Sequence, residues 1–251
     1  MNLNIDYRTR CYESYFSQHW QYDHEDSQET YDRCAKVNKI QYNKFLPQNK
    51  EAKILDIACG AGHFLYFLQK TGYLNSSGID ISKEMLEHAS KMGVKNIQHA
   101  DLFKYLTAYN QHFDLIIAND IIEHLNKNEV LRLLDLIYSS LDPEGCVLIT
   151  CPNAQSLFGN SARFCCFTHE QAFTPTSMSQ VMRICNFREV QIIGLKPIAY
   201  DLRSSIRLML WLCIQKLLKA YLIIERGTGR GCDLDRTVEY RLLVVGKKRP
   251  E

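Results

Sequence analysis

Residues 53–67 read KILDIACGAGHFLYF, and residues 76–80 read SSGID. The first stretch is an apolar run that reaches an acid, turns through glycines and continues as an amphipathic segment, which is the pattern of a strand followed by a helix. The first amides of such a helix face a ligand. Gly60 and Gly62 leave no Cβ where a cofactor must lie against the backbone, and they permit φ values that other residues resist. The sequence therefore predicts a binding loop.

Acids stand at the ends of the apolar runs. Asp80 closes the second stretch, where a carboxylate can accept hydrogen bonds from two ribose hydroxyls, as in nucleoside-binding α/β folds. A short run ends at Asp101, and the run FDLIIAND ends at Asp120. Ligands of parallel sheets bind outside the carboxyl ends of the strands. With Asp56 in the first stretch, these acids are therefore predicted to mark one edge of a sheet.

Helix signals separate these runs. Ser82 can cap the helix after Asp80, and Gly93 can end that helix in a left-handed turn. Asn126 and Glu129 have the spacing of a capping box for the next long helix, which we expect to end at the turn over residues 142–145. The alternation of strands and helices with short loops predicts a parallel sheet covered on both faces.

The stretch from Asp56 to Gly62 fits D-x-x-C-G-x-G, and through it the chain resembles the class I S-adenosylmethionine (SAM) methyltransferases over about residues 53–194. Leu65 occupies the place of the third glycine of a dinucleotide-binding fingerprint, and Asp56 suits a cationic ammonium better than a pyrophosphate. Within the family, the chain looks most like the group that contains ubiquinone-biosynthesis O-methyltransferases and many glycan-modifying methyltransferases.

The resemblance implies a fold and a set of cofactor contacts. The fold would be a Rossmann-like, doubly wound, mostly parallel seven-stranded sheet with an antiparallel last strand. SAM would bind and leave as S-adenosylhomocysteine. The methionine part would lie on Asp56 and the backbone of Cys59, Gly60 and Gly62, the ribose on Asp80 and Ile81, the adenine edge on Asp101 and Leu102, and the sulfonium under Asn119.

Composition is that of an ordinary globular enzyme. Hydrophobic residues make up 46% and charged residues 23% of the 251 residues, and the net charge of +2 gives no sign of a nucleic-acid partner. The ten cysteines include no C-x-x-C pair, which predicts neither a disulfide framework nor a zinc knuckle. No apolar segment follows the N-terminal charges, so we expect no secretory signal and a cytoplasmic location.

The segment Asp120-Ile-Ile-Glu123-His124 could place two carboxylates and an imidazole on one side of a helix. With His169, these groups could ligate a divalent cation, and the resembling small-RNA and ubiquinone-pathway enzymes use the same spacing with Glu in the first place. The simpler interpretation is favoured: Glu123 pairs locally, His124 lines the active site, and no metal is used.

The acceptor site is predicted in the loop over residues 151–175. Aromatic side chains, a cation and an imidazole are mixed there, as in methyltransferases of bacterial surface polysaccharide and glycolipid assembly. His169 is the first candidate for the acid/base group, with His124 as the second, because a neutral imidazole can take the proton of an alcohol during transfer. An ordinary surface histidine beside Glu170 is the competing interpretation.

The C-terminal region departs from the minimal fold. Roughly forty residues separate a sixth strand near residues 188–194 from the last strand, where the family has a short hairpin. Residues 206–224 are very apolar, with basic residues spaced through them, but too interrupted to cross a bilayer. An amphipathic helix on the inner face of the membrane is slightly favoured, and a homodimer interface or a helix packed on the sheet is the alternative.

Three regions are thus expected: an N-terminal helical lid over residues 1–50, the SAM-binding core over residues 51–195, and a helical insertion with the final strand over residues 196–251. The leading function is O-methylation of a sugar hydroxyl in a lipid-linked or cell-surface glycan. A quinone-pathway phenol O-methyltransferase and a non-catalytic nucleoside-cofactor-binding protein are the alternatives. The residues do not identify the acceptor.

Overall fold

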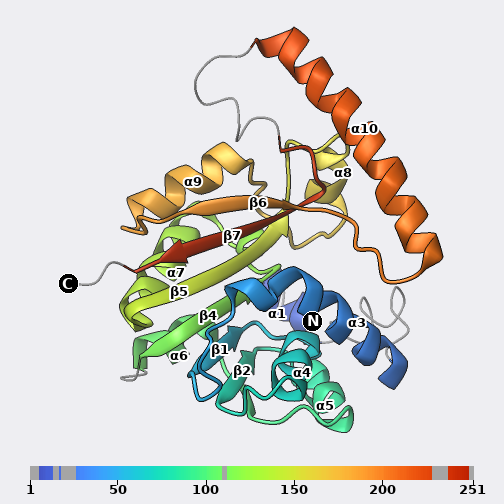
Figure 1. Cartoon of the computed structure of the whole chain (residues 1–251). Coiled ribbons are helices and arrows are strands. Elements are labelled where there is room, and N and C mark those ends of the chain that lie inside the picture. Colours follow the sequence, from blue (N-terminus) through green and yellow to red (C-terminus); the bar gives the residue numbers. More distant parts are fainter. Residues whose placement is uncertain (1–5, 14–16, 18–26, 109–111, 228–236, 249–251) are drawn as a thin grey trace. The chain divides into compact units, whose positions relative to one another are not determined.

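The fold is built on one sheet. A computed structural model describes residues 6–13, 17, 27–108, 112–227 and 237–248. Seven strands lie in the order β3-β2-β1-β4-β5-β7-β6 (Figure 1). The pairings of β1 with β2 and β4, and of β2 with β3, are parallel, whereas β6 and β7 are antiparallel. The predicted Rossmann-like sheet with an antiparallel last strand is confirmed.

Helices and strands alternate as the sequence predicts. The strands are β1 (Ile54–Ile57), β2 (Ser76–Asp80), β3 (Ile97–His99), β4 (Phe113–Asn119), β5 (Leu141–Pro152), β6 (Gln191–Leu195) and β7 (Arg241–Lys247). The described helices are α1 (Tyr7–Tyr12), α3 (Gln28–Tyr42), α4 (His63–Lys70), α5 (Lys83–Lys91), α6 (Leu102–Ala108), α7 (Lys127–Ser140), α8 (Gly159–Phe164), α9 (Pro175–Ile184) and α10 (Leu202–Arg226), with the 3-10 helices η2 (Asn43–Phe45) and η3 (Ile122–His124).

The chain divides into two compact units. The first comprises residues 1–119 and 139–146, and the second comprises residues 120–138 and 147–251. This division is based on the compactness of the two units. It does not test the three regions that the sequence predicts, which stay predictions. Part of the expected N-terminal lid, including Tyr15, Phe16 and Trp20, lies outside the described residues.

In the first unit, the local signals act as expected. All four residues of β1 are buried, and the apolar side of α4 is buried with it. The Ser82 side chain accepts a hydrogen bond from the Met85 amide at the start of α5, and Gly93 follows that helix with φ of 84°. These caps fix where the helices begin and end next to the predicted binding loop.

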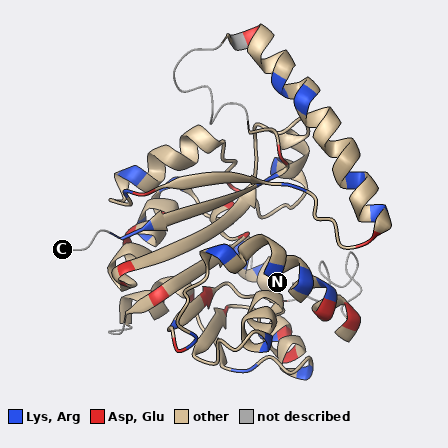
Figure 2. Cartoon of the chain, viewed as in Figure 1, with Lys and Arg blue, Asp and Glu red and all other residues tan. Residues whose placement is uncertain are grey.

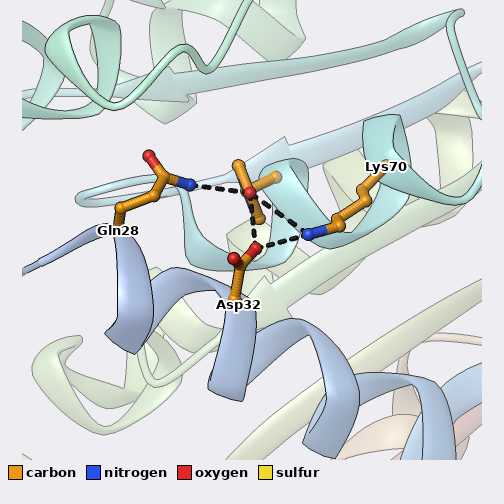
Figure 3. A network of polar contacts seen from close by, with 4 residues as sticks. Gln28, Asp32 and Lys70 are labelled. Atoms are coloured by element: carbon orange, nitrogen blue, oxygen red, sulfur yellow. Dashed lines mark hydrogen bonds and ion pairs between the residues drawn. The ribbon is translucent and has the colours of Figure 1, made fainter.

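Helix α3 packs on α4 through a polar network (Figure 3). The Tyr66 hydroxyl donates to Asp32 Oδ1 at 2.7 Å and receives a hydrogen bond from the Gln28 side-chain amide at 2.7 Å. Lys70 forms an ion pair with Asp32. The lysine ammonium, followed by the tyrosine hydroxyl, lowers the pKa of Asp32. The N-terminal region is therefore joined to the helix that follows the glycine loop.

In the second unit, three helices begin at capping residues. The Asn126 amide donates to Glu129 Oε2 at 2.8 Å, while the Glu129 amide donates to Asn126 Oδ1 at 3.1 Å, so the predicted capping box is present. Thr174 with Ser177, and Asp201 with Ser204, form capping boxes for α9 and α10. Each box satisfies amides that have no partner inside the helix.

Two boundaries differ from the sequence-based expectation. β5 begins at Leu141, so the expected turn over residues 142–145 lies within the strand, where Glu144 adopts φ of 68°. The segment after β4 forms the short 3-10 helix η3 and α7 begins only at Lys127, whereas an α-helix from Asp120 was considered. Among the described residues, no helix combines the length and hydropathy that crossing a bilayer requires.

Gly78 in β2 offers a test of the packing under the loop. An added Cβ would lie 2.3 Å from Leu65 Cδ1 and 2.9 Å from Cys59 Sγ. We expect Gly78→Ala to reduce the free energy of unfolding by about 1–3 kcal/mol, as overpacking does. Denaturant unfolding would measure this change. Ser77→Ala, one residue away, is the control, and equal stability of the two variants would contradict the packing argument.

Candidate functional site

The glycine loop of the first unit has a backbone that few residues tolerate. Ala58, Gly60 and Gly62 have φ of 53°, 54° and 76°, in the left-handed region. The Cys59 amide donates to the Ile79 carbonyl at 3.0 Å, so the loop is attached to β2. An added Cβ at Gly60 would lie 3.2 Å from Met85 Cε. Met85 therefore fills the space that a side chain at Gly60 would need, and the left-handed backbone of the loop leads directly into α4.

Asp80 joins this loop to the next turn. Its Oδ2 accepts a hydrogen bond from the Gly60 amide at 2.8 Å, and its Oδ1 accepts one from the Ser82 amide at 2.7 Å. Burial raises the pKa of Asp80, while the amide hydrogen bonds act in the opposite direction. A carboxylate has lone pairs for further donors besides these two amides, so ribose hydroxyls can still bind there.

Asp56 is the most unusual group in the loop region. The residue is 2% exposed, and its buried Oδ1 has no hydrogen-bond partner. Burial, and then the charge of Asp80, raises the pKa of Asp56 well above its ordinary value. A buried carboxylate without a partner is costly, and a bound cation with N–H donors would satisfy it. The ammonium of SAM is such a group, so these residues fit the predicted cofactor.

The other predicted cofactor residues follow neighbouring strands. Ile81 is half exposed, and its carbonyl contacts His99 Nε2 at 2.9 Å. Asp101 Oδ1 accepts a hydrogen bond from the Lys104 amide, so this acid caps α6, which begins at Leu102. Asn119 is the last residue of β4. The adenine role of Asp101 and the sulfonium role of Asn119 stay predictions.

Tyr31 in α3 is a contact that the sequence did not indicate. It is fully buried, and its hydroxyl donates to the Ala61 carbonyl within the glycine loop at 2.5 Å. Its ring stacks on that of His63 at 4.1 Å between centroids. In the sequence, Tyr31 is one of many aromatic residues of the N-terminal region, and nothing local distinguishes it as a contact of the glycine loop. The N-terminal helix α3 therefore supports the loop directly.

In the second unit, one of the two acids after β4 is paired with a cation and the other is buried. Asp120, with φ of 51°, forms an ion pair with Arg241 of β7. Glu123 is 2% exposed, and burial raises its pKa well above the ordinary value. Cys151 in β5 is also buried, and burial raises the pKa of its thiol. The Asp120 carboxylate is therefore already paired with the guanidinium of Arg241.

The two candidate histidines lie together. His124 and His169 have ring centroids 4.6 Å apart in an edge-to-face arrangement. The Glu170 amide donates to the Glu123 carbonyl at 2.8 Å, which attaches the predicted acceptor loop to η3. Burial lowers the pKa of His169, and the nearby Arg163 contributes to the shift. His169 is therefore neutral at neutral pH, as a proton acceptor must be.

Comparisons with known proteins identify the family of this chain. A family model described as a methyltransferase domain matches residues 22–192. A candidate methyltransferase of Bacillus subtilis is 31% identical over 106 residues, covering 39% of this chain and 42% of that protein. A small RNA 2′-O-methyltransferase of Schizosaccharomyces pombe is 30% identical over 118 residues, covering 40% of this chain and 31% of that protein. The matches thus span less than half of these relatives.

Solved structures share the fold at low identity. A SAM-dependent methyltransferase from Archaeoglobus fulgidus has a TM-score of 0.63 at 22% identity, covering 92% of this chain and all of that one. The phosphoethanolamine N-methyltransferase 2 of Haemonchus contortus, in complex with SAM, has a TM-score of 0.61 at 16% identity, covering 96% of this chain and 60% of that one. The chain belongs to the methyltransferase domain family and has the fold of SAM-dependent methyltransferases.

Proposed function

We propose that this chain transfers a methyl group from SAM to a hydroxyl group on a sugar of a lipid-linked or cell-surface glycan. The observation that carries the transferase part is the buried, unpartnered Asp56 oxygen beside a glycine loop with a left-handed backbone. The acid suits the ammonium of SAM, and Asp80 suits its ribose. SAM supplies an activated methyl group on a sulfonium and leaves as neutral S-adenosylhomocysteine.

The chemistry left to the protein is alignment of the acceptor and removal of its proton. His169 supports an oxygen acceptor because burial lowers the pKa of its imidazole, so the ring is neutral and able to take a proton. His124 lies beside it and is buried. A phenol of the quinone pathway would use the same groups, so acceptor assays with labelled SAM should compare a lipid-linked glycan with a quinone-pathway phenol.

Helix α10 supports a lipid-linked acceptor, because its two faces are inverted relative to an ordinary surface helix. The buried side chains on it are polar: Ser204 and Gln215. Large apolar side chains are exposed instead, with Met209 at 59%, Leu217 at 72% and Ile224 at 84%. Large exposed apolar surfaces mark interaction sites with proteins or membranes. Trp211 is half-buried, and its indole nitrogen is buried.

The charges on α10 favour an anionic membrane surface as the partner. Figure 2 shows basic residues along the helix, with acidic residues only near its two ends. The basic residues with described side chains are Arg203, Arg207, Lys216 and Lys219. Each basic residue near an anionic leaflet contributes about 1 kcal/mol. We therefore propose that α10 holds the enzyme on the cytoplasmic face of the membrane, where its acceptor is carried.

Removing the charge of Asp80 should weaken SAM binding. Because Asp80 also accepts amide hydrogen bonds of the chain, Asp80→Asn is the better variant than Asp80→Ala, which would leave both amides without a partner. Loss of a charge-assisted hydrogen bond costs about 1.5–3 kcal/mol, so calorimetry should find SAM affinity lower by about tenfold or more. Asp142→Asn is the control. Unchanged affinity in folded Asp80→Asn protein would refute the ribose assignment.

The proton-handling role predicts a separation of binding from turnover. His169→Ala, and likewise His124→Ala, should lower the rate of methyl transfer by roughly 10²–10⁴-fold, as loss of a general base does, and leave SAM affinity intact. Single-turnover kinetics and calorimetry on the same preparations measure the two quantities. If transfer persists at the original rate without both imidazoles, the proton leaves by another route.

Membrane attachment can be tested by flotation with anionic liposomes. The intact protein should float at low salt, while a Leu210→Glu, Leu217→Glu double variant should stay at the bottom, because each exposed leucine loses up to about 1.5–3 kcal/mol of burial in the membrane. Leu74→Glu, at an exposed leucine of the first unit, is the control. Light scattering that finds a dimer of the intact protein, broken by the double variant, with no flotation, would make α10 a subunit interface.

A further inference from the structure

We propose that His124, Cys166 and His169 form a binding site for a divalent cation of the zinc class. One ring nitrogen of each histidine and the cysteine sulfur all lie within 4.8 Å of one another. The three residues come from η3 and from the loop between α8 and α9, both in the second unit. Imidazole and thiolate are the ligands that zinc prefers in proteins. The composition of the cluster therefore selects this class of metal over magnesium or calcium.

The ligand atoms of His124, Cys166 and His169 would have to move only a short distance toward one another to bind a zinc ion. Zinc–nitrogen bonds of about 2.0–2.1 Å and zinc–sulfur bonds of about 2.3 Å place tetrahedral ligand atoms about 3.3–3.6 Å apart. The observed limit of 4.8 Å thus leaves a movement of about 1 Å. Cys166 lies outside regular secondary structure and is half-buried, so its side chain can make this movement without breaking a helix or strand.

Hydrogen bonds orient the ligands in the way that metal sites use. His169 Nδ1 contacts the Ala162 carbonyl at 3.0 Å, which fixes the proton on Nδ1 and leaves Nε2 as the metal-binding atom. His124 Nδ1 contacts the hydroxyl of the buried Thr168 at 2.8 Å. The same hydroxyl lies 3.1 Å from Cys166 Sγ. The Thr168 hydroxyl therefore contacts two of the three proposed ligands, His124 and Cys166.

The charges around the cluster are mixed. Arg163 opposes a cation, but its guanidinium is engaged by the backbone carbonyls of His169 and Glu170. Asp120 acts on His169 with the opposite sign. Metal binding requires neutral imidazoles and a deprotonated thiol, so it releases protons. A coordinating thiolate would neutralise part of the charge of the ion.

The site differs from the one suggested by the spacing of Asp120, Glu123 and His124. Asp120 is paired with Arg241, and Cys166 takes the place of the acids. Three protein ligands leave a fourth position open, as in catalytic zinc sites. If an acceptor hydroxyl bound there, its proton would pass to solvent water, and the two imidazoles would act as metal ligands instead of as proton acceptors; this last step rests on the proposed function.

Metal binding can be measured without SAM or acceptor, which separates this test from that of the transferase function. The full-length protein, dialysed against a chelator, is titrated with Co²⁺ and then with Zn²⁺. We expect one equivalent to bind, with a cobalt–thiolate charge-transfer band in the near ultraviolet that Zn²⁺ abolishes. Cys166→Ser should remove the band and weaken Zn²⁺ binding at least tenfold, while Cys165→Ser, at the exposed neighbouring cysteine, should behave like the original protein.

Two further variants keep the test decisive. His169→Ala and His124→Ala should each weaken Zn²⁺ binding by a similar factor, and SAM affinity measured on every variant reports whether the protein is folded. Stoichiometric binding that survives in Cys166→Ser would place the metal on other cysteines and overturn the proposal. Absence of stoichiometric binding in the original protein would overturn it as well.

Discussion

The hydrogen bond from the Gly60 amide to the Asp80 carboxylate is the contact on which the cofactor region depends. It joins the loop after β1 to the end of β2, and the second oxygen of Asp80 receives the Ser82 amide that leads into α5. The loop can adopt its left-handed backbone because these amides have a charged acceptor. One carboxylate thus holds the glycine loop, the end of β2 and the start of α5 together, and the proposed ribose contact would use this same carboxylate.

The two buried acids of this unit place an electrostatic cost on the protein without its ligand. Burial raises the pKa values of Asp56 and Asp80, and the charge of Asp80 raises the pKa of Asp56 further. A native pKa raised above the unfolded value means that this contribution to stability is present at low pH and is lost as the pH rises and the groups ionise. A bound ammonium offsets that cost. The two buried acids therefore suit a cationic ligand.

Local signals were enough to predict much of the fold and the left-handed glycine loop, because they depend on neighbours in sequence. Asn126 with Glu129 is such a case, and the capping box is where the sequence places it. The pairing of Asp120 with Arg241 joins residues 121 positions apart, and no local pattern specifies it. Cys166 and His169 have a suggestive spacing, but only the folded loop brings them to His124. Contacts between residues far apart in the sequence therefore determine the partner of Asp120 and the neighbours of His124, which local patterns do not specify.

The attachment of α10 explains how an apolar helix can be held with its apolar face outward. Gln215 donates to Glu239, a residue that is 4% exposed beside the antiparallel pair of β6 and β7. Gly194 in β6 makes room for this acid, since an added Cβ would lie 2.2 Å from Glu239 Oε2. The inner face of α10 therefore contains a buried hydrogen bond, whose direction fixes the orientation of the helix. The leucines of α10 do not all have to pack against the rest of the second unit. A helix fixed in this way leaves large apolar side chains such as Leu217 and Ile224 exposed, which is the surface that the proposed membrane contact would use.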